Sequence, residues 1–267
     1  MPLPDRYETL RLSVPAPHLL LVELDRPQAM NALNTQMGRD LLELWTRLTE
    51  DPEDLRCVVL TGTGERAFCA GGDLKERDGM TDAQWRRQHE IFERQHWTLA
   101  DLPLPVIAAV NGHAYGGGFE MVLSCDFVYA ARHARFALPE VGLGIMPGAG
   151  GTQNLPRAVG ERRAKEIVLT GRPLSAGQAA DWGIVNALAD DVPALRAMAL
   201  DTARAIAANA PLSVRQAKKS IRYGMQMELR TAFRFEVEAY NALVGTADRH
   251  EGVRAFNEKR RPKFEGR

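Results

Sequence analysis

Two glycine-rich segments of this 267-residue chain could bind a developing negative charge through backbone amides. Residues 67–74 read Ala-Phe-Cys-Ala-Gly-Gly-Asp-Leu, and residues 111–120 read Asn-Gly-His-Ala-Tyr-Gly-Gly-Gly-Phe-Glu. Glycine permits positive φ and close approach of a ligand, so such segments can direct several N–H groups at one oxygen atom. The second segment leads into a predicted helix, whose N-terminus adds positive potential. Tight turns packed against helices would look the same, so each segment taken alone leaves both interpretations open.

Two carboxylates stand in apolar surroundings and are candidates for proton transfer. Glu120 follows the three glycines at the first turn of the predicted helix, and Glu140 interrupts the apolar run 136–145. Burial would raise the pKa of such a carboxyl group and suit it to general acid–base catalysis. The structural alternatives are a helix-dipole or capping role for Glu120 and a loop-anchoring hydrogen bond for Glu140.

Other catalytic motifs are incomplete or stand in the wrong context. Residues 62–67 match G-x-G-x-x-A, but two further glycines follow where a dinucleotide-binding turn would open into a helix. The P-loop, zincin and G-x-S-x-G signatures are absent from the sequence. His89 and His96 lie seven residues apart on one predicted helix without a third ligand, so no metal site is expected.

Composition narrows the class of protein. The 34 Lys plus Arg residues balance 34 Asp plus Glu residues, and 45% of the chain is hydrophobic, which excludes a polyanion-coating protein and a disordered chain. No apolar run approaches the roughly 20 residues of a membrane helix, and no signal peptide is visible. Three widely spaced cysteines without a C-x-x-C favour a reducing, cytoplasmic location over a disulfide framework.

Helix and strand signals alternate through the first two thirds of the sequence. The expected elements are a hairpin over 7–25, helices over 35–50 and 82–100, and strands over 57–60 and 106–110. Asn34 or Thr35 can cap the first helix, and Asp51-Pro52 ends it. This order predicts an α/β fold whose chemistry lies in loops at the carboxyl ends of parallel strands. Residues 192–256 are helix-forming almost throughout and are expected to pack on the body or on another subunit.

Five segments, in this order, resemble the enoyl-CoA hydratase/isomerase family, the crotonases, over nearly the whole chain. They are Asp25-Arg-Pro-Gln-Ala-Met-Asn-Ala-Leu33, Glu65-Arg-Ala-Phe-Cys-Ala-Gly-Gly-Asp-Leu74, Val106-Ile-Ala-Ala-Val-Asn-Gly112, Pro139-Glu-Val-Gly-Leu-Gly-Ile-Met-Pro-Gly-Ala-Gly-Gly-Thr152 and Glu251-Gly-Val-Arg-Ala-Phe-Asn-Glu-Lys-Arg260. The resemblance implies an α/β, crotonase-like spiral of ββα units with a C-terminal helical trimerisation region. It further implies a core over 1–195, an oligomerisation region over 196–267, and homo-trimers that can pair into hexamers.

The resemblance also assigns site residues. The oxyanion-hole amides fall on Ala70 and Gly117, and the catalytic carboxylates on Glu120 and Glu140. Residues 148–152 would open a helix near the water site. The coenzyme A portion of the substrate would be bound by these residues: Ala29, Met30, Ala70, Gly71, Gly72, Asp73, Leu74, Phe256 and Lys259. Coenzyme A arrives as part of the acyl-CoA thioester, so no separate cofactor is expected.

The presence of both glutamates favours reversible hydration of a 2-enoyl-CoA to a 3-hydroxyacyl-CoA. An enoyl-CoA isomerase, or another lyase or hydrolase using the same oxyanion hole, is the alternative. Residues 73–82 resemble the methylglutaconyl-CoA hydratase branch, in which Arg86, Arg87 or Arg94 could meet a distal carboxylate, although exposed helix arginines are commoner.

That branch includes an RNA-binding relative, so nucleic-acid binding is the alternative of a different class. The corresponding helix, residues 35–50, has no lysine and balances its two arginines with acidic residues, so no nucleic-acid partner is expected.

Overall fold

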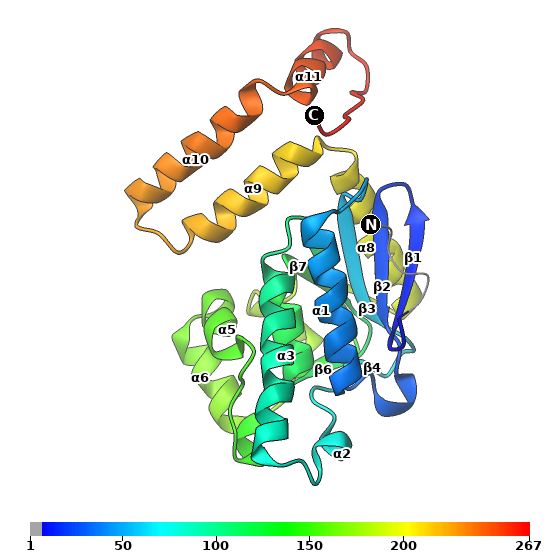
Figure 1. The fold of residues 1–267 in the computed structure, drawn as a ribbon, viewed down its shortest axis with the longest axis vertical. Helices are drawn as coiled ribbons and strands as arrows, with labels where there is room; N and C mark the ends of the chain where they lie inside the picture. The colour runs from blue at the N-terminus through cyan, green and yellow to red at the C-terminus, as the bar shows by residue number, and fades with distance from the viewer. Residues whose placement is uncertain (1–6) are drawn as a thin grey trace.

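The computed structural model describes residues 7–267, which form two β-sheets covered by helices (Figure 1). The larger sheet has the order β1-β2-β3-β5-β7-β10, with bounds Leu10–Ala16, Leu19–Leu24, Cys57–Gly62, Val106–Val110, Phe127–Ala131 and Ala187–Ala189. The smaller sheet has the order β4-β6-β8-β9, with bounds Ala67–Cys69, His113–Tyr115, Arg135–Ala137 and Leu174–Ser175. Only β1 with β2 and β8 with β9 pair antiparallel among these strands.

The chain passes from the large sheet to the small sheet three times. Strand β3 is followed by β4, β5 by β6 and β7 by β8, and helices come after each pair. These ββα units confirm the α/β spiral expected from the sequence. The predicted hairpin is β1 with β2, and the two predicted helices are α1 (Thr35–Glu50) and α3 (Asp82–Ala100). The Asn34 side chain accepts the N–H of Met37, so it is the expected cap of α1.

Apolar side chains point alternately to the two faces of the large sheet along its central strands, so both faces must be covered. On β2, Leu20 and Val22 belong to the core that also contains α1 residues, whereas Leu19 and Leu21 belong to a second core. That second core lies under α8 (Val192–Ala207), whose Ala199 is fully buried against it. Parallel strands buried on both faces read as continuous apolar runs, which is why β3 and β5 could be recognised in the sequence.

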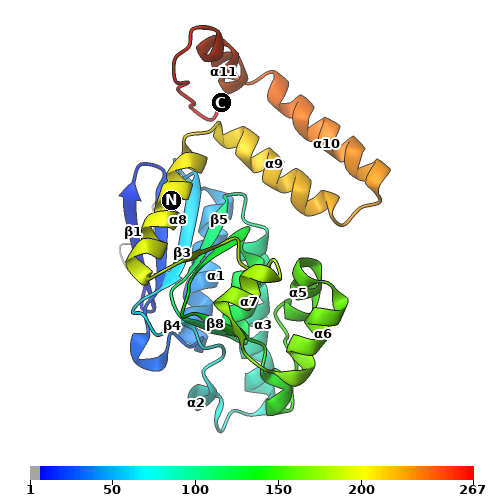
Figure 2. The same ribbon diagram turned by 180° about the vertical axis from the view of Figure 1, so that it is seen from behind.

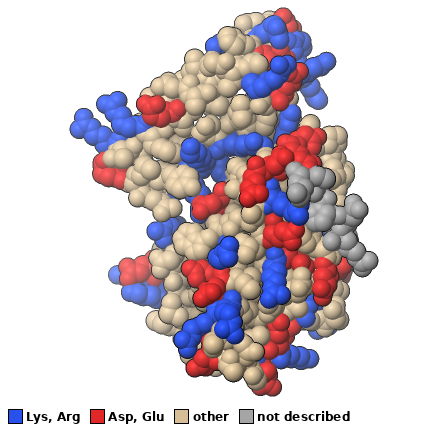
Figure 3. All heavy atoms as spheres, viewed as in Figure 1, with Lys and Arg blue, Asp and Glu red and all other residues tan. Residues whose placement is uncertain are grey.

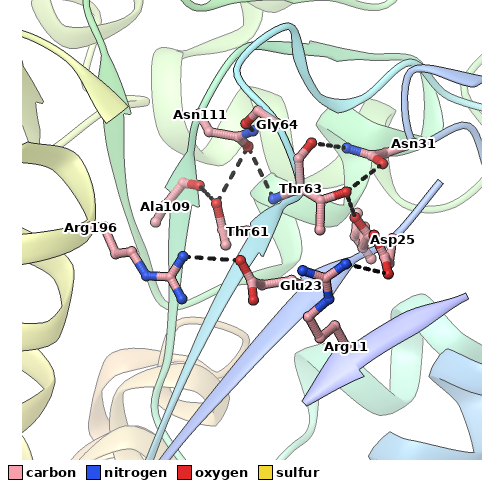
Figure 4. A network of polar contacts seen from close by, with 12 residues as sticks. Arg11, Glu23, Asp25, Asn31, Thr61, Thr63, Gly64, Ala109, Asn111 and Arg196 are labelled. Atoms are coloured by element: carbon pink, nitrogen blue, oxygen red, sulfur yellow. Dashed lines mark hydrogen bonds and ion pairs between the residues drawn. The ribbon is translucent and has the colours of Figure 1, made fainter. Parts of the chain in front are cut away.

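Two buried asparagines fix the turns from which the smaller sheet starts (Figure 4). Asn111 accepts the N–H of Gly62 at 3.0 Å and donates to the carbonyl of Gly64 at 2.7 Å. Asn31 donates to the carbonyls of Thr63 and Ala67, at 3.1 and 2.9 Å. The G-x-G-x-x-A segment therefore closes into a turn that leads to β4, and no helix begins there.

Helices α9 (Pro211–Gly224) and α10 (Leu229–Val244) form an arm that projects from the body, followed by α11 (Ala247–Asn257), as Figures 1 and 2 show. The boundary expected at 195/196 falls inside α8, and α8 packs on the large sheet. Because α8 packs on the large sheet, the body, meaning the two sheets and the helices packed on them, extends to the end of α8. The arm is tied to the body by ion pairs of Lys218 with Asp126 and Arg222 with Asp101, at 2.7 and 2.8 Å.

Charges of both signs are interspersed over the face that carries α1 (Figure 3). On α1, Arg47 pairs with Glu43 at 2.9 Å, one turn away. Within residues 7–267, no helix has both the length and the apolar composition to cross a membrane.

Candidate active site

One pocket of about 560 Å³ collects most of the residues that the sequence singled out. Its walls come from the segment after β4, from α3, from the start of α4 (Gly117–Ser124) and from residues 139–149. The expected catalytic residues Ala70, Gly117, Glu120 and Glu140 all line it. The structure thus brings the two glycine-rich segments and the two carboxylates to a single site.

The two glycine-rich segments meet through their backbones. Gly71 has φ +91°, and a Cβ added there would lie 2.8 Å from the carbonyl oxygen of Tyr115 and 3.5 Å from the amide nitrogen of Gly117. Gly116, with φ +51° and ψ −128°, is in a backbone region that side chains disfavour. A Cβ on Gly118 would lie 2.2 Å from the carbonyl oxygen of Cys69. The glycines are therefore required by close packing of the two segments as well as by any ligand.

The two candidate oxyanion donors differ in availability. Gly117 is the first residue of α4, where an N–H has no intrahelical acceptor and the helix dipole adds positive potential. The Ala70 N–H donates to the carbonyl oxygen of Met30 at 3.1 Å. A substrate oxygen at Ala70 must therefore share or replace that hydrogen bond, whereas the Gly117 amide has no such competitor.

Glu120 is 3% exposed and is held through one carboxylate oxygen. Its Oε1 accepts the N–H groups of Ala149 and Gly151, each at 2.8 Å. Gly151 begins α5 (Gly151–Val159), so the carboxylate caps that helix from outside. Glu120 therefore both caps α5 and lines the pocket. Its Oε2 has no hydrogen-bond partner among residues 7–267.

Glu140 is 8% exposed and begins the short 3-10 helix η2 (Glu140–Leu143). Its Oε2 is buried without a hydrogen-bond partner among the described residues, so the loop-anchoring bond considered from the sequence is not made by that oxygen. The pKa of Glu140 is raised to about 7, chiefly by burial; a backbone hydrogen bond opposes this shift, and the charge of Glu120 adds to it. A carboxyl group with this pKa can both donate and accept a proton near neutral pH.

Aromatic and cationic side chains from α2 (Leu74–Arg77) and α3 complete the pocket. The Arg77 guanidinium lies 4.3 Å from the centre of the Trp85 ring, and its Nε donates to Gln88 at 2.7 Å. Burial lowers the pKa of Arg77. His89 also lines the pocket, packed against Gly148. Of the three arginines expected near a distal carboxylate, only Arg86 lines this pocket; Arg87 and Arg94 are exposed elsewhere.

The expected coenzyme A residues fall into three groups. Ala70, Gly71, Gly72 and Leu74 line the pocket. Ala29, Met30 and Asp73 do not line it. The Met30 carbonyl accepts the Ala70 amide, and Asp73 pairs with Arg26 at 2.9 Å and caps α2. Phe256 and Lys259 lie at or just beyond the end of α11, at the opposite end of the molecule from α2 (Figure 1). These two residues do not join the pocket of their own chain.

Sequence reasoning missed several groups at this site. Arg77, at the end of α2, was not singled out, and His96 was considered only as a metal ligand. The contact of His96 with Gly117 depends on the packing of α3 against α4, which no local pattern shows. The amides of Ala149 and Gly151 could have been suspected from the glycine run 148–152, which does open α5. No group of three or more His, Cys, Asp or Glu side chains within residues 7–267 is arranged to hold a metal ion.

Comparison with known proteins shows which family has this sequence and fold. The profile of the enoyl-CoA hydratase/isomerase family matches residues 17–267. The short-chain-enoyl-CoA hydratase of Clostridium acetobutylicum is 40% identical over 246 residues, covering 92% of this chain and 93% of that protein. The mevalonyl-coenzyme A hydratase of Aspergillus fumigatus is 41% identical over 260 residues, covering 95% and 93%. A crystal structure of enoyl-CoA hydratase from Bacillus anthracis has a TM-score of 0.95 and 42% identity, covering 97% of this chain and all of that one.

Proposed function

Because the chain belongs to the enoyl-CoA hydratase/isomerase family, we propose that Glu120, Glu140 and the Gly117 amide together add water across the double bond of a 2-enoyl-CoA. The enzyme is an enoyl-CoA hydratase, and the product is a 3-hydroxyacyl-CoA. The observation that carries the assignment of roles is the presence in one pocket of two unlike carboxyl groups beside an unpaired helix N-terminus.

The proposed reaction divides its protons between the two carboxyl groups. Glu120 accepts a proton from water through Oε2 while the water oxygen bonds to Cβ of the substrate. The electrons of the double bond move to the thioester oxygen as an enolate, which the amides of Gly117 and Ala70 stabilise. Glu140 then gives its proton to Cα. Dehydration is the same sequence reversed, and the chain's own groups supply every step without a separate cofactor.

Loss of the enoyl-thioester absorbance of crotonyl-CoA tests this proposal. Glu120→Gln and Glu140→Gln should each lower the rate by about 10²- to 10⁴-fold, the range for losing a general acid or base. Glu166→Gln, at an exposed carboxylate of α6 (Glu161–Thr170), is the matched control and should keep the wild-type rate. Wild-type turnover by either pocket variant would overturn the roles. No turnover by the wild type, with conversion of a 3-enoyl-CoA instead, would favour the isomerase.

Arg77 supports a finer proposal on the acyl group. Its guanidinium lines the pocket, half-buried, and no carboxylate within residues 7–267 lies at ion-pair distance from it. The charge of Glu76 acts on Arg77 from beyond ion-pair distance, and guanidinium matches carboxylate geometry. We therefore propose that the substrate carries a second carboxylate at the far end of a short, branched acyl chain, as in 3-methylglutaconyl-CoA.

The test compares two substrates on one variant. Arg77→Gln should lower kcat/KM for 3-methylglutaconyl-CoA by about 30-fold or more, the scale of a lost charged hydrogen bond, and leave crotonyl-CoA hydration within about twofold. Arg87→Gln, exposed outside the pocket, is the control. An equal loss on both substrates would mean that Arg77 is structural, because it stacks on Trp85 and bonds Gln88. Unchanged kcat/KM of Arg77→Gln on both substrates would contradict the proposal that the substrate carries a second carboxylate.

Assembly as a homo-trimer, or as a hexamer of paired trimers, is proposed from the arm. Apolar side chains of α9 and α10 are exposed, among them Ile221, Phe233 and Tyr240 at 69%, 60% and 68%. Phe256 and Lys259 do not line their own pocket, and α11, which precedes Lys259, lies at the opposite end of the molecule from α2 (Figure 1). An arm seated on a neighbouring body would cover these side chains and carry Phe256 and Lys259 toward a coenzyme A bound by another copy.

The state of the three cysteines supports the proposal that the chain is a cytoplasmic enzyme of acyl-CoA metabolism. Cys57, Cys69 and Cys125 are free. Burial raises the pKa of Cys57 and of Cys69 to about 12, which leaves both thiols unreactive at neutral pH.

A further inference from the structure

The imidazole of His96 lies directly behind the proposed oxyanion hole, and we infer that it positions the Gly117 peptide for catalysis. This inference rests on the proposed hydratase function. His96 is 2% exposed on α3, and its Nε2 lies 3.0 Å from the carbonyl oxygen of Gly117. It lines the same pocket as Glu120 and Glu140. His96 is a positioning residue, since it acts on the substrate through Gly117.

The first turn of α4 is held by hydrogen bonds on both sides of Gly117. The chain enters it from Gly116, whose φ of +51° only glycine adopts readily, and the first N–H groups of a helix are unpaired. On the N-terminal side, the Gly116 N–H donates to the carbonyl of Ala137 at 2.9 Å. On the C-terminal side, His96 binds the Gly117 carbonyl. Between these two bonds, the Gly116 carbonyl accepts the N–H groups of Phe119 and Glu120 at 2.8 and 2.9 Å, which holds the peptide unit that carries the Gly117 N–H. His96 therefore acts on the next peptide unit and keeps the first turn of α4 in place.

The two ring nitrogens of His96 face two backbone carbonyl groups. Nδ1 faces the carbonyl oxygen of Phe92 and the side-chain amide of Gln95, whereas Nε2 faces the carbonyl oxygen of Gly117. A carbonyl oxygen only accepts, so a neutral ring can donate to one of the two carbonyls, and the inferred anchoring of Gly117 requires the proton on Nε2.

The carbonyl of Phe92 holds the other edge of the ring. It lies 2.7 Å from Nδ1, one helical turn before His96 on α3. The ring is thus clamped between its own helix and the first turn of α4. Because α3 and α4 are separate elements of the fold, this clamp also fixes the wall of the pocket that carries His89 relative to the oxyanion hole.

Three substitutions separate the Gly117 bond from simple packing. His96→Gln retains an amide N–H near the position of Nε2, His96→Asn retains one only near Nδ1, and His96→Leu retains neither. We expect His96→Leu and His96→Asn to lower kcat for crotonyl-CoA by about 10- to 100-fold at nearly unchanged KM, the scale for a misplaced catalytic group. His96→Gln should recover kcat to within about threefold. His250→Leu, at an exposed histidine of α11, is the matched control.

A spectroscopic readout tests the same point without turnover. The absorption of a 4-dimethylaminocinnamoyl-CoA thioester moves to longer wavelength when its carbonyl oxygen accepts hydrogen bonds. The shift on binding should be smaller in His96→Leu and His96→Asn than in the wild type, and restored in His96→Gln. Wild-type kcat and wild-type shifts in the Leu and Asn variants would overturn the inference. Equal losses in all three variants would do so too, because packing alone would then explain them.

Failure of the proposed function gives a different pattern. An inactive wild type on every enoyl-CoA would remove the hydratase reaction, yet the bound chromophore would still report whether His96 orients the Gly117 amide. Thermal unfolding of each variant checks that the fold is intact. If His96→Leu is unfolded at the assay temperature, the comparison of the Asn and Gln variants, which keep a polar group under α4, carries the test.

Discussion

The two pocket glutamates show how surroundings give the same side chain two tasks. Glu120 accepts two backbone N–H groups through one oxygen, which holds the carboxylate in place, and in the proposed reaction the other oxygen orients water. Glu140 makes no such bond through its buried Oε2, and burial raises its pKa. Pairs of titratable groups whose environments differ in this way are the signature of divided acid and base roles.

The raised pKa of Glu140 predicts the same pH profile for the two reaction directions. The proposed reaction uses one proton on the pair Glu120 and Glu140, and it takes up or releases no net proton, so its equilibrium constant does not depend on pH and kcat/KM must change together in both directions. We expect kcat/KM for crotonyl-CoA and for 3-hydroxybutyryl-CoA to fall as pH rises through about 7, where the pair loses that proton. Initial rates in both directions between pH 5 and 9 check the prediction. A kcat/KM that does not change across this interval would contradict the proton-donating role of Glu140.

At the residue scale, sequence reasoning finds groups that stand in a local pattern. Glu120, Glu140 and the glycines were identified because an acid or a glycine run interrupts an apolar segment. Arg77 was not identified, and His96 was considered only as a metal ligand, because charged and polar residues are ordinary in residues 74–100. The contact of His96 with the oxyanion hole depends on how α3 packs against α4, which is a tertiary property.

At the scale of elements, the glycine run 116–118 serves packing and chemistry together. Helix α4 starts so close to β4 that a Cβ on Gly118 would lie 2.2 Å from the Cys69 carbonyl oxygen, and 2.7 Å from the Cys69 Cβ. The backbone of one glycine-rich segment therefore contacts that of the other. This contact is what places the Ala70 and Gly117 amides at one site.

Gly118→Ala is therefore expected to separate α4 from β4. The clash involves backbone, which cannot turn aside, so the free energy of unfolding should fall by about 1 to 3 kcal/mol, the usual cost of overpacking. Hydration should fall more steeply than stability, because Gly117 and Glu120 both move with α4. Denaturant unfolding and crotonyl-CoA rates measure the two effects. Gly245→Ala, where an added Cβ meets nothing within 4 Å, is the control. Equal stability of the two variants would contradict this account.

The order of the helices and strands could be predicted from the sequence more completely than the way they pack. Continuous apolar runs and capped, periodic helices gave β3, β5, α1 and α3 close to their observed bounds. The strands of the smaller sheet have only two or three residues each, too few for periodicity to show. A helix on the sheet and a helix in the arm have similar local composition, so composition alone does not mark the residue at which the arm begins.

At the scale of the whole molecule, the body and the arm bury their apolar residues differently. The body surrounds its sheets with two cores, whereas α10 has no buried residue and α9 only Pro211. An unpartnered apolar hairpin of this kind is typical of an interaction surface. The proposed assembly explains it and also the distance between the pocket and the residues Phe256 and Lys259.

Charge placed on the arm should therefore dissociate the assembly. The double variant Phe233→Glu, Tyr240→Glu is expected to reduce the mass in solution to that of one 29.6 kDa chain, because each new carboxylate would be buried without a partner in the interface. Static light scattering after size exclusion gives the mass.

The KM for crotonyl-CoA should be higher in the same variant, since Phe256 and Lys259 would no longer reach a neighbouring pocket. The circular dichroism of the body should be retained. Leu169→Glu, at an exposed apolar position of α6, supplies the charge control. A wild-type chain that is already monomeric would end the assembly proposal and leave the pocket of each copy to bind coenzyme A with its own residues alone.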